Sequence, residues 1–242
     1  MTDEPPRHHA RGERAATPRT PHDGAPSTHA PEELRAGPIG GQLWVVARGV
    51  FLALRLPALA ARYDSTAVLA VFSFINGCIS IALMAAVALL SHQPFVFPSL
   101  GPTAFLFFYT PLAPAASPRN AFIGHLIGVV AGWSSLAAFH LLHAGPAMMT
   151  GVTAARIGAA ALSLGLTSGL MVLLRAPHPP AGATTLIISL GLLRTIEEMA
   201  VLMAAVVLLT VQAMVINRLA GVPYPVWGAR TRNESATNRE KR

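Results

Sequence analysis

The chain has 242 residues and a formal net charge of +7, with 52% hydrophobic and only 12% charged residues, and its mean hydropathy is +0.50. A soluble domain carries about 25% charged residues, so this composition excludes a protein whose whole surface faces water. The single cysteine, Cys78, excludes an internal disulfide and a cysteine-based metal site, and its place in an apolar run predicts a buried thiol.

The first 40 residues are rich in Pro, Arg and His and contain no apolar core of the kind that a signal peptide needs. This composition predicts a disordered tail. In residues 41–64, arginines recur every seventh position, at 48, 55 and 62, opposite Leu and Phe side chains. The pattern predicts an amphipathic helix in the membrane interface. A fifth span is the alternative, although Arg55 and Pro57 would then lie near its middle.

Four long uncharged apolar runs follow, each of about 18 or more residues, which is enough to cross a hydrocarbon core of ~30 Å. They cover residues 66–91, 121–143, 157–174 and 199–217. We predict that all four are transmembrane helices of an all-α, polytopic membrane domain over residues 65–221. A basic tail, residues 222–242, follows it.

Two shorter apolar stretches, residues 98–110 and 178–190, lie between the long runs and begin with Pro, Gly and small polar residues. A helix of ~13 residues is only ~20 Å long, which is short for a span. Such stretches fit re-entrant loops or half-helices, which occur where they are buried in protein or line a wet cavity. The repeated order of long helix, short segment and long helix predicts an internal repeat, in which Pro98 corresponds to Pro177.

The positive charges predict the topology, because Lys and Arg concentrate on the cytoplasmic side of a membrane. Both termini are therefore expected in the cytoplasm, with the domain in the inner membrane. Four crossings result if the short stretches only dip into the bilayer, and six if they complete a crossing. The six-crossing version places Arg119 and Arg175 inside and makes the two repeats inverted, and we favour it.

Glycines recur every four residues in two of the runs, at Gly124, Gly128 and Gly132 and again at Gly165 and Gly169. Small residues at this spacing let helices approach closely in lipid, which predicts packing seams. A glycine face beside a pathway is the alternative. The same faces are compatible with a homo-oligomer.

The chemistry is expected at the starts of the broken segments and of the second long run. Peptide N–H groups at a helix start bind anions, and small residues leave them accessible. Pathways for metal ions or for proton-coupled uptake usually need an intramembrane carboxylate, but no Asp or Glu lies between Asp64 and Glu197. The predicted substrate is therefore a small anion. The candidate substrate-binding residues are Ser99, Gly101, Pro102, Thr103, Arg119, Asn120, His125, His178, Pro179, Pro180, Gly182, Thr184 and Thr185.

Each of the main candidates has a structural alternative. Arg119 contacts an anion or anchors a helix end at the headgroups. His178 contacts the substrate or carries a proton, or it caps a helix or bonds a carbonyl group. His125 is alternatively a polar contact between helices. Enzyme motifs are missing from the sequence, so we expect no enzyme activity, cofactor or bound metal. The basic tails indicate anionic lipid as partner and not nucleic acid.

Three segments together resemble the HPP family of integral membrane proteins: PSLGPTAFLFF, SPRNAFIGH and LMVLLRAPHPPAGATTLI. That family is named for the motif that stands here at His178, Pro179 and Pro180. The resemblance covers residues 66–221 and implies a domain of four membrane helices. Because members in cyanobacteria and chloroplasts are implicated in nitrite transport, it also implies nitrite as the first candidate substrate. Nitrate, formate, another solute, or a non-transporting role in a membrane assembly are the alternatives.

Overall fold

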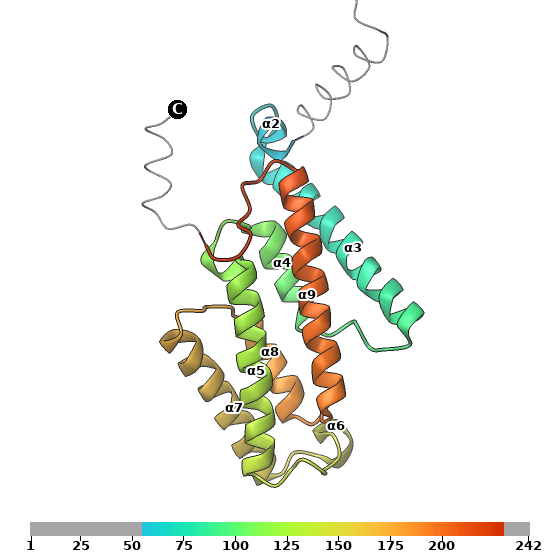
Figure 1. Cartoon of the computed structure of the whole chain (residues 1–242), viewed down its shortest axis with the longest axis vertical. Coiled ribbons are helices and arrows are strands. Elements are labelled where there is room, and N and C mark those ends of the chain that lie inside the picture. The colour runs from blue at the N-terminus through green and yellow to red at the C-terminus, as the bar shows by residue number, and fades with distance from the viewer. Residues whose placement is uncertain (1–54, 230–242) are drawn as a thin grey trace, which may run out of the picture. The chain divides into compact units, whose positions relative to one another are not determined.

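The computed structural model describes residues 55–229, and all regular structure within them is helical (Figure 1). Four helices are long and apolar enough to cross a membrane, which confirms the predicted polytopic α-helical fold. They are α3 (Ser65–Ser91), α5 (Pro118–Ala138), α7 (Ala154–Leu173) and α9 (Ile196–Leu219). The shorter elements are α2 (Leu56–Ala60), α4 (Leu100–Tyr109), η2 (Pro114–Ala116), α6 (Ala147–Thr150) and α8 (Ala181–Ser189).

The predictions for the two tails, residues 1–40 and 222–242, lie outside the described residues, apart from residues 222–229. Of the predicted interfacial helix, residues 41–64, only the last ten residues are described. They contain α2, which has five residues and follows Arg55 in an extended backbone conformation. The interfacial placement of this segment stays a prediction.

α5 ends five residues before the end of its apolar run, because local hydrogen bonds close it at His140. His140 has a left-handed φ of 57°, the amide of Leu141 donates to the carbonyl of Leu136 at 2.8 Å, and the His140 amide donates to Ala137 at 3.0 Å. These two bonds form a Schellman motif, which satisfies the last carbonyl groups of a helix. The hydropathy of the sequence does not indicate this helix end, since the residues beyond it are still apolar.

Hydrogen bonds between helix ends define two ends of the domain. At the first end, the Leu56 amide donates to Ala220 just after α9, and the Arg119 side chain at the start of α5 donates to the carbonyl of Arg175 just after α7. The first end thus gathers the starts of α3 and α5 and the ends of α7 and α9. α3 and α5 run in one direction, and α7 and α9 run in the other (Figure 1).

At the second end, the Arg194 side chain before α9 donates to Ala144 after α5, and the Ala147 amide donates to Leu190 after α8. Because α3 and α5 both start at the first end, the chain between them crosses back, through an extended stretch and the half-helix α4 (Figure 1). The chain from the end of α7 to the start of α9 crosses back in the opposite sense through α8. The described domain therefore makes six passages, as two inverted repeats of three.

Each half-helix packs within its own repeat and against the other repeat. α4 lies against α3 and α9, and α8 lies against α7 and α5. On α9, the Asn217 side chain donates to the carbonyl of Phe107 on α4 at 3.0 Å. The buried core follows the same plan, since Leu100 and Phe107 of α4 pack with Leu202 and Leu209 of α9. Because α4 packs on α9 and α8 packs on α5, each half-helix is held between its own repeat and the other repeat.

The glycines of α5 form a packing seam, as predicted. A Cβ at Gly124 would lie 2.6 Å from the Cβ of His178, and one at Gly128 would lie 2.8 Å from the carbonyl oxygen of Ala181. A Cβ at Gly165 or Gly169 on α7 would meet nothing within 4 Å, so these two glycines form no seam among the described residues. The seam on α5 brings the start of α8 against its backbone.

Cys78 is exposed on α3, and the prediction of a buried thiol is wrong. α3 packs on the domain through one narrow stripe, Asn76, Ser80 and Met84, and Cys78 lies off that stripe. In a membrane helix an apolar neighbourhood in sequence does not imply burial in protein, because the surrounding lipid is equally apolar.

Candidate functional site

The two broken segments enter their half-helices through the same backbone turn. The Leu100 amide donates to Phe97 at 2.9 Å, and the Ala181 amide donates to His178 at 3.0 Å. The residues before the helices also share a conformation, with φ and ψ of −69° and −20° at Ser99 and of −56° and −22° at Pro180. The structural register of the repeat is therefore 81 residues, and Pro98 corresponds to Pro179 instead of Pro177.

This register places Thr103 and Thr184 at the same position, the fourth residue of each half-helix. Both threonines are fully buried, as are His125 on α5 and His178 in the turn before α8. The four side chains form one hydrogen-bonded cluster, which we call the histidine pair with its two threonines. His125 lies seven residues into α5, roughly 10 Å below the helix start.

The two imidazoles contact each other through their Nε2 atoms, which are 3.2 Å apart. The Thr103 hydroxyl lies 2.9 Å from Nε2 of His125 and 3.3 Å from Nε2 of His178. The Thr184 hydroxyl lies 2.7 Å from Nδ1 of His125. The remaining ring nitrogen, Nδ1 of His178, lies 2.8 Å from the carbonyl oxygen of Ala115. Every ring nitrogen of the pair thus has a partner.

The partners assign the ring protons with both imidazoles neutral. The carbonyl of Ala115 only accepts, so His178 carries its proton on Nδ1 and its Nε2 is an acceptor. His125 then donates from Nε2, and the Thr184 hydroxyl donates to its Nδ1. The Thr103 hydroxyl, 3.0 Å from the carbonyl of Ser99, donates there. In this arrangement the Nε2 atom of His178 holds the lone pair available to a further proton.

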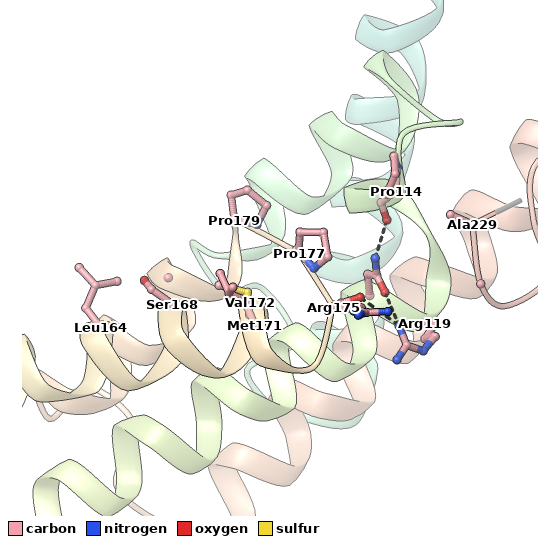
Figure 2. Close-up of a pocket in the computed structure, with 13 residues that line it drawn as sticks. Pro114, Arg119, Leu164, Ser168, Met171, Val172, Arg175, Pro177, Pro179 and Ala229 are labelled. Carbon is pink, nitrogen blue, oxygen red and sulfur yellow. Dashed lines mark hydrogen bonds between the residues drawn. The ribbon is translucent and has the colours of Figure 1, made fainter. Parts of the chain in front are cut away.

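A cavity of about 980 Å³ opens beside the cluster at the first end. Its walls come from the start of α5, the last turns of α7, the start of α8 and the residues around the histidine turn (Figure 2). Pro177 and Pro179 line it on either side of His178, whose side chain points away to Ala115. Arg119 and Arg175 lie together on the wall, and no Asp or Glu lines it. The cavity is therefore electropositive.

The first peptide groups of α8 and α5 differ from the prediction, because they are already hydrogen-bonded. At α8, the amides of Ala181, Gly182 and Ala183 donate to the carbonyls of residues 178, 179 and 180. At α5, the Arg119 amide donates to Trp227 and the Asn120 amide to the Ser117 hydroxyl. In this conformation the donors that remain for an anion are side chains, chiefly the guanidinium groups of the cavity.

A row of buried polar side chains continues from the cluster toward the second end, between α7 and α8. The Thr185 hydroxyl lies 3.5 Å from the carbonyl of Ser163, and both side chains are fully buried. One turn further along α8, the carbonyl of Ser189 accepts a bond of 3.2 Å from the guanidinium of Arg156. Arg156 is itself 2% exposed and also donates to Gly145 at 2.7 Å. The row thus ends on a buried cation.

Residues 62–225 match the family model described as "HPP, transmembrane region". The chain belongs to this family. No curated protein and no solved structure matches it. The HPP motif in this chain is the turn at 178–180 that starts the half-helix α8, and the same turn at 97–99 has the sequence Phe-Pro-Ser. The two turns of the HPP domain thus share the central proline and differ on either side of it, and only the second turn carries a titratable side chain, His178.

The structure brings most of the predicted site residues of the HPP domain into two groups. Thr103, His125, His178 and Thr184 form the cluster, and the Ser99 carbonyl joins it through Thr103. The cavity is lined by Arg119, Asn120, Pro179 and Gly182. Pro180 is buried in the turn, and Thr185 belongs to the polar row. Gly101 and Pro102 are exposed on α4 and join neither group.

Sequence reasoning did not identify Arg156, Arg175, Ser163 and Tyr224 as parts of the site. Arg156 immediately precedes the third predicted run, residues 157–174, and the observed helix α7 includes it. A charged residue directly beside an apolar run is the feature that could have indicated it. Tyr224 follows α9, and its hydroxyl donates to the carbonyl of Ala116 beside the cluster. Its burial raises the pKa of the phenol above the ordinary value. No pattern in the sequence places that tyrosine against η2.

Proposed function

We propose that this HPP-family protein transports a small inorganic anion across the membrane, with nitrite as the first candidate. The observation that carries the proposal is a succession of buried polar groups among the described residues, with cations at both ends and no acid. It runs from the cavity with Arg119 and Arg175, past the histidine pair, along the buried hydroxyl groups to Arg156.

The charges along this series favour an anion over a cation. Polar side chains buried in a membrane domain are costly and therefore mark pathways more often than packing. Each guanidinium offers a planar set of N–H donors that fits a carboxylate-like group such as the two oxygens of nitrite. A metal ion or ammonium would meet only positive charges at both ends. The absence of acids between Asp64 and Glu197 makes compensation within the domain unavailable.

We also propose that the first end of the domain lies on the cytoplasmic side of the inner membrane. Positive charges concentrate on the cytoplasmic side, and the described residues are asymmetric in this respect. The arginines at the first end are Arg55, Arg62, Arg119, Arg175 and Arg218, and those at the second end are Arg156 and Arg194. Both termini are then cytoplasmic. We propose no enzymatic activity for the protein. Its proposed partners are the lipid bilayer and the transported anion. The exposed glycines of α7 are compatible with a homo-oligomer.

The test is nitrite entry into proteoliposomes that contain the purified full-length chain, measured beside empty liposomes. A starting pH near 8 limits the background, because nitrous acid crosses bare lipid. We expect entry that depends on the protein and falls at least tenfold in Arg119→Ala and Arg175→Ala. Arg62→Ala is the matched control, because Arg62 is exposed at the same end and does not line the cavity.

Two outcomes would refute parts of the proposal. Protein-dependent flux that is equal in the three arginine variants would remove the cavity from the pathway. Flux of nitrate or formate with none of nitrite would keep anion transport and exclude nitrite. No flux of any of the three anions above empty liposomes would refute the transport function.

A further inference from the structure

The pathway proposed above contains no fixed charge between the cavity at the first end and Arg156 at the second. An anion that leaves Arg119 must pass the histidine pair and the hydroxyl groups of Thr184 and Thr185 before it reaches the next cation. An uncompensated ion in such a low-dielectric interior is strongly disfavoured. Along this stretch of the described residues, the two imidazoles are the side chains whose ordinary pKa lies nearest neutrality, and an anion bound beside them would stabilise the positive charge of a protonated ring.

The geometry of the pair provides one site for that charge. With both rings neutral, His125 donates from Nε2 and His178 offers the Nε2 lone pair 3.2 Å away. A proton added to this lone pair leaves two N–H groups directed at the same point. Two donors facing each other need a shared acceptor, and Thr103 is the only side chain within reach of both Nε2 atoms. An anionic oxygen between the rings is the better acceptor, because its charge balances the imidazolium.

Few other titratable or charged groups surround the pair in the described residues. The buried side chains of α4 and α8 are apolar groups and hydroxyls such as Thr103 and Thr184, and the buried stripe of α3 adds the uncharged amide of Asn76. On the η2 side, Tyr224 is held on the carbonyl of Ala116, and Arg119 and Arg175 lie in the adjoining cavity. The charged residues of α9 are Glu197, Glu198 and Arg218, at its two ends, and Arg156 of α7 is bonded at the second end. No acid contacts either ring, so an anion would be the counter-ion of the protonated pair.

We propose that the protein carries one proton with each monovalent anion, and that the proton binds at Nε2 of His178 while the anion binds between the two imidazoles. The proposal rests on the anion transport proposed above. A proton from water at the first end forms the new N–H bond and makes His178 an imidazolium. The bond breaks again when the anion leaves, and the proton returns to water at the other end. Proton and anion therefore favour each other's binding, and the transported pair is neutral.

The experiment uses the full-length chain in proteoliposomes with nitrite as the probe and initial rates corrected for empty vesicles. In one arm, valinomycin and a K⁺ gradient impose an inside-positive potential of about 60 mV at equal pH, which is equivalent to a tenfold gradient of a univalent ion. In the other arm, the potential is clamped at zero and the outside is one pH unit more acidic. A lumenal pH dye reports the protons.

The proposal expects no acceleration of nitrite uptake by the potential, and several-fold acceleration by the pH gradient with one proton entering per nitrite. The background in the potential arm does not respond to the potential, because the species that crosses bare lipid is neutral nitrous acid and not nitrite. Uptake driven by potential without proton entry would overturn the coupling and leave anion transport intact. Absence of nitrite, nitrate and formate uptake in both arms would overturn both proposals.

A matched pair of variants assigns the proton to His178. His178→Asn keeps an N–H donor near the Nδ1 position for Ala115 and removes the titrating ring, and His143→Asn makes the same change at an exposed histidine near the second end. We expect pH-driven uptake to fall at least tenfold in H178N and to change less than twofold in H143N. Full coupling in H178N would overturn the assignment, whereas the two wild-type arms test the coupling even if this variant fails to fold.

Discussion

Replacing Gly128 with alanine tests whether the glycine seam of α5 positions the half-helix α8. The new Cβ would lie 2.8 Å from the carbonyl oxygen of Ala181 and 3.4 Å from the amide nitrogen of Thr185. Both are backbone atoms, so no side-chain rotation relieves the contact. Overpacking of this kind costs about 1–3 kcal/mol, whereas alanine in place of glycine returns about 1 kcal/mol of helix propensity. The expected net loss of unfolding free energy is roughly 1 kcal/mol.

The same substitution at Gly169 is the control, because a Cβ there meets nothing within 4 Å. G169A should gain the helix propensity without the clash and be more stable than the wild type by up to about 1 kcal/mol. Thermal unfolding of the two variants in detergent should therefore move in opposite directions, by roughly 2–4 °C per kcal/mol for a chain of this size. A G128A midpoint equal to or above that of G169A would refute the argument that the seam is closed by backbone contact.

Three further predictions concern single side chains. Arg156→Lys keeps the charge but loses the planar fork that reaches two backbone carbonyls, so the unfolding free energy should fall by about 2 kcal/mol in thermal unfolding; an unchanged midpoint would contradict this. Thr184→Val preserves the side-chain shape and removes the hydroxyl donor to Nδ1 of His125. Nitrite flux should therefore fall several-fold, and the unpaired buried nitrogen should lower the unfolding free energy by about 1–2 kcal/mol; wild-type flux would count against the cluster. Tyr224 has a raised pKa, so the stability that it contributes is present below pH ~10 and is lost as the pH rises above it; Tyr224→Phe should remove this alkaline slope and, by leaving the carbonyl of Ala116 unpaired, lower the stability at pH 7 by about 1–2 kcal/mol.

Hydropathy and length sufficed to predict the membrane fold, because each long helix is one uninterrupted apolar run. The half-helices also followed from sequence, since Pro98 and Pro179 with the following small residues mark where the backbone turns. The register of the repeat did not follow. Aligned proline spacings gave 79 residues, whereas the hydrogen bonds that close the two turns give 81. The few identical residues in the two halves are too sparse to determine the register of the repeat, whereas the backbone geometry of the two turns determines it directly.

The candidate site also has a part that the sequence predicts and a part that only the fold shows. Residue type selected His125, His178 and the threonines, because titratable and hydroxyl groups in a membrane domain are rare and costly. Their union in one cluster depends on α5, α4 and α8 meeting, which is a property of the fold. The prediction of exposed peptide groups was wrong at the starts of α5 and α8, and at α8 the reason is local. The carbonyls of the turn at His178 lie close enough to accept from the first amides of α8.

The packing of each half-helix against a long helix of the other repeat has a consequence for biosynthesis. α4 completes its packing only against α9, which begins about 90 residues after α4 ends. At translation rates of roughly 5–20 residues per second, α4 spends on the order of ten seconds at the membrane without that partner. During this interval the buried hydroxyl groups of its first turn, Ser99 and Thr103, face lipid or the insertion machinery. The passage that contains α4 is thus synthesised early but completes its packing only when α9 arrives. A nascent chain that stops before α9 leaves the translocon with α4 unpacked on that side.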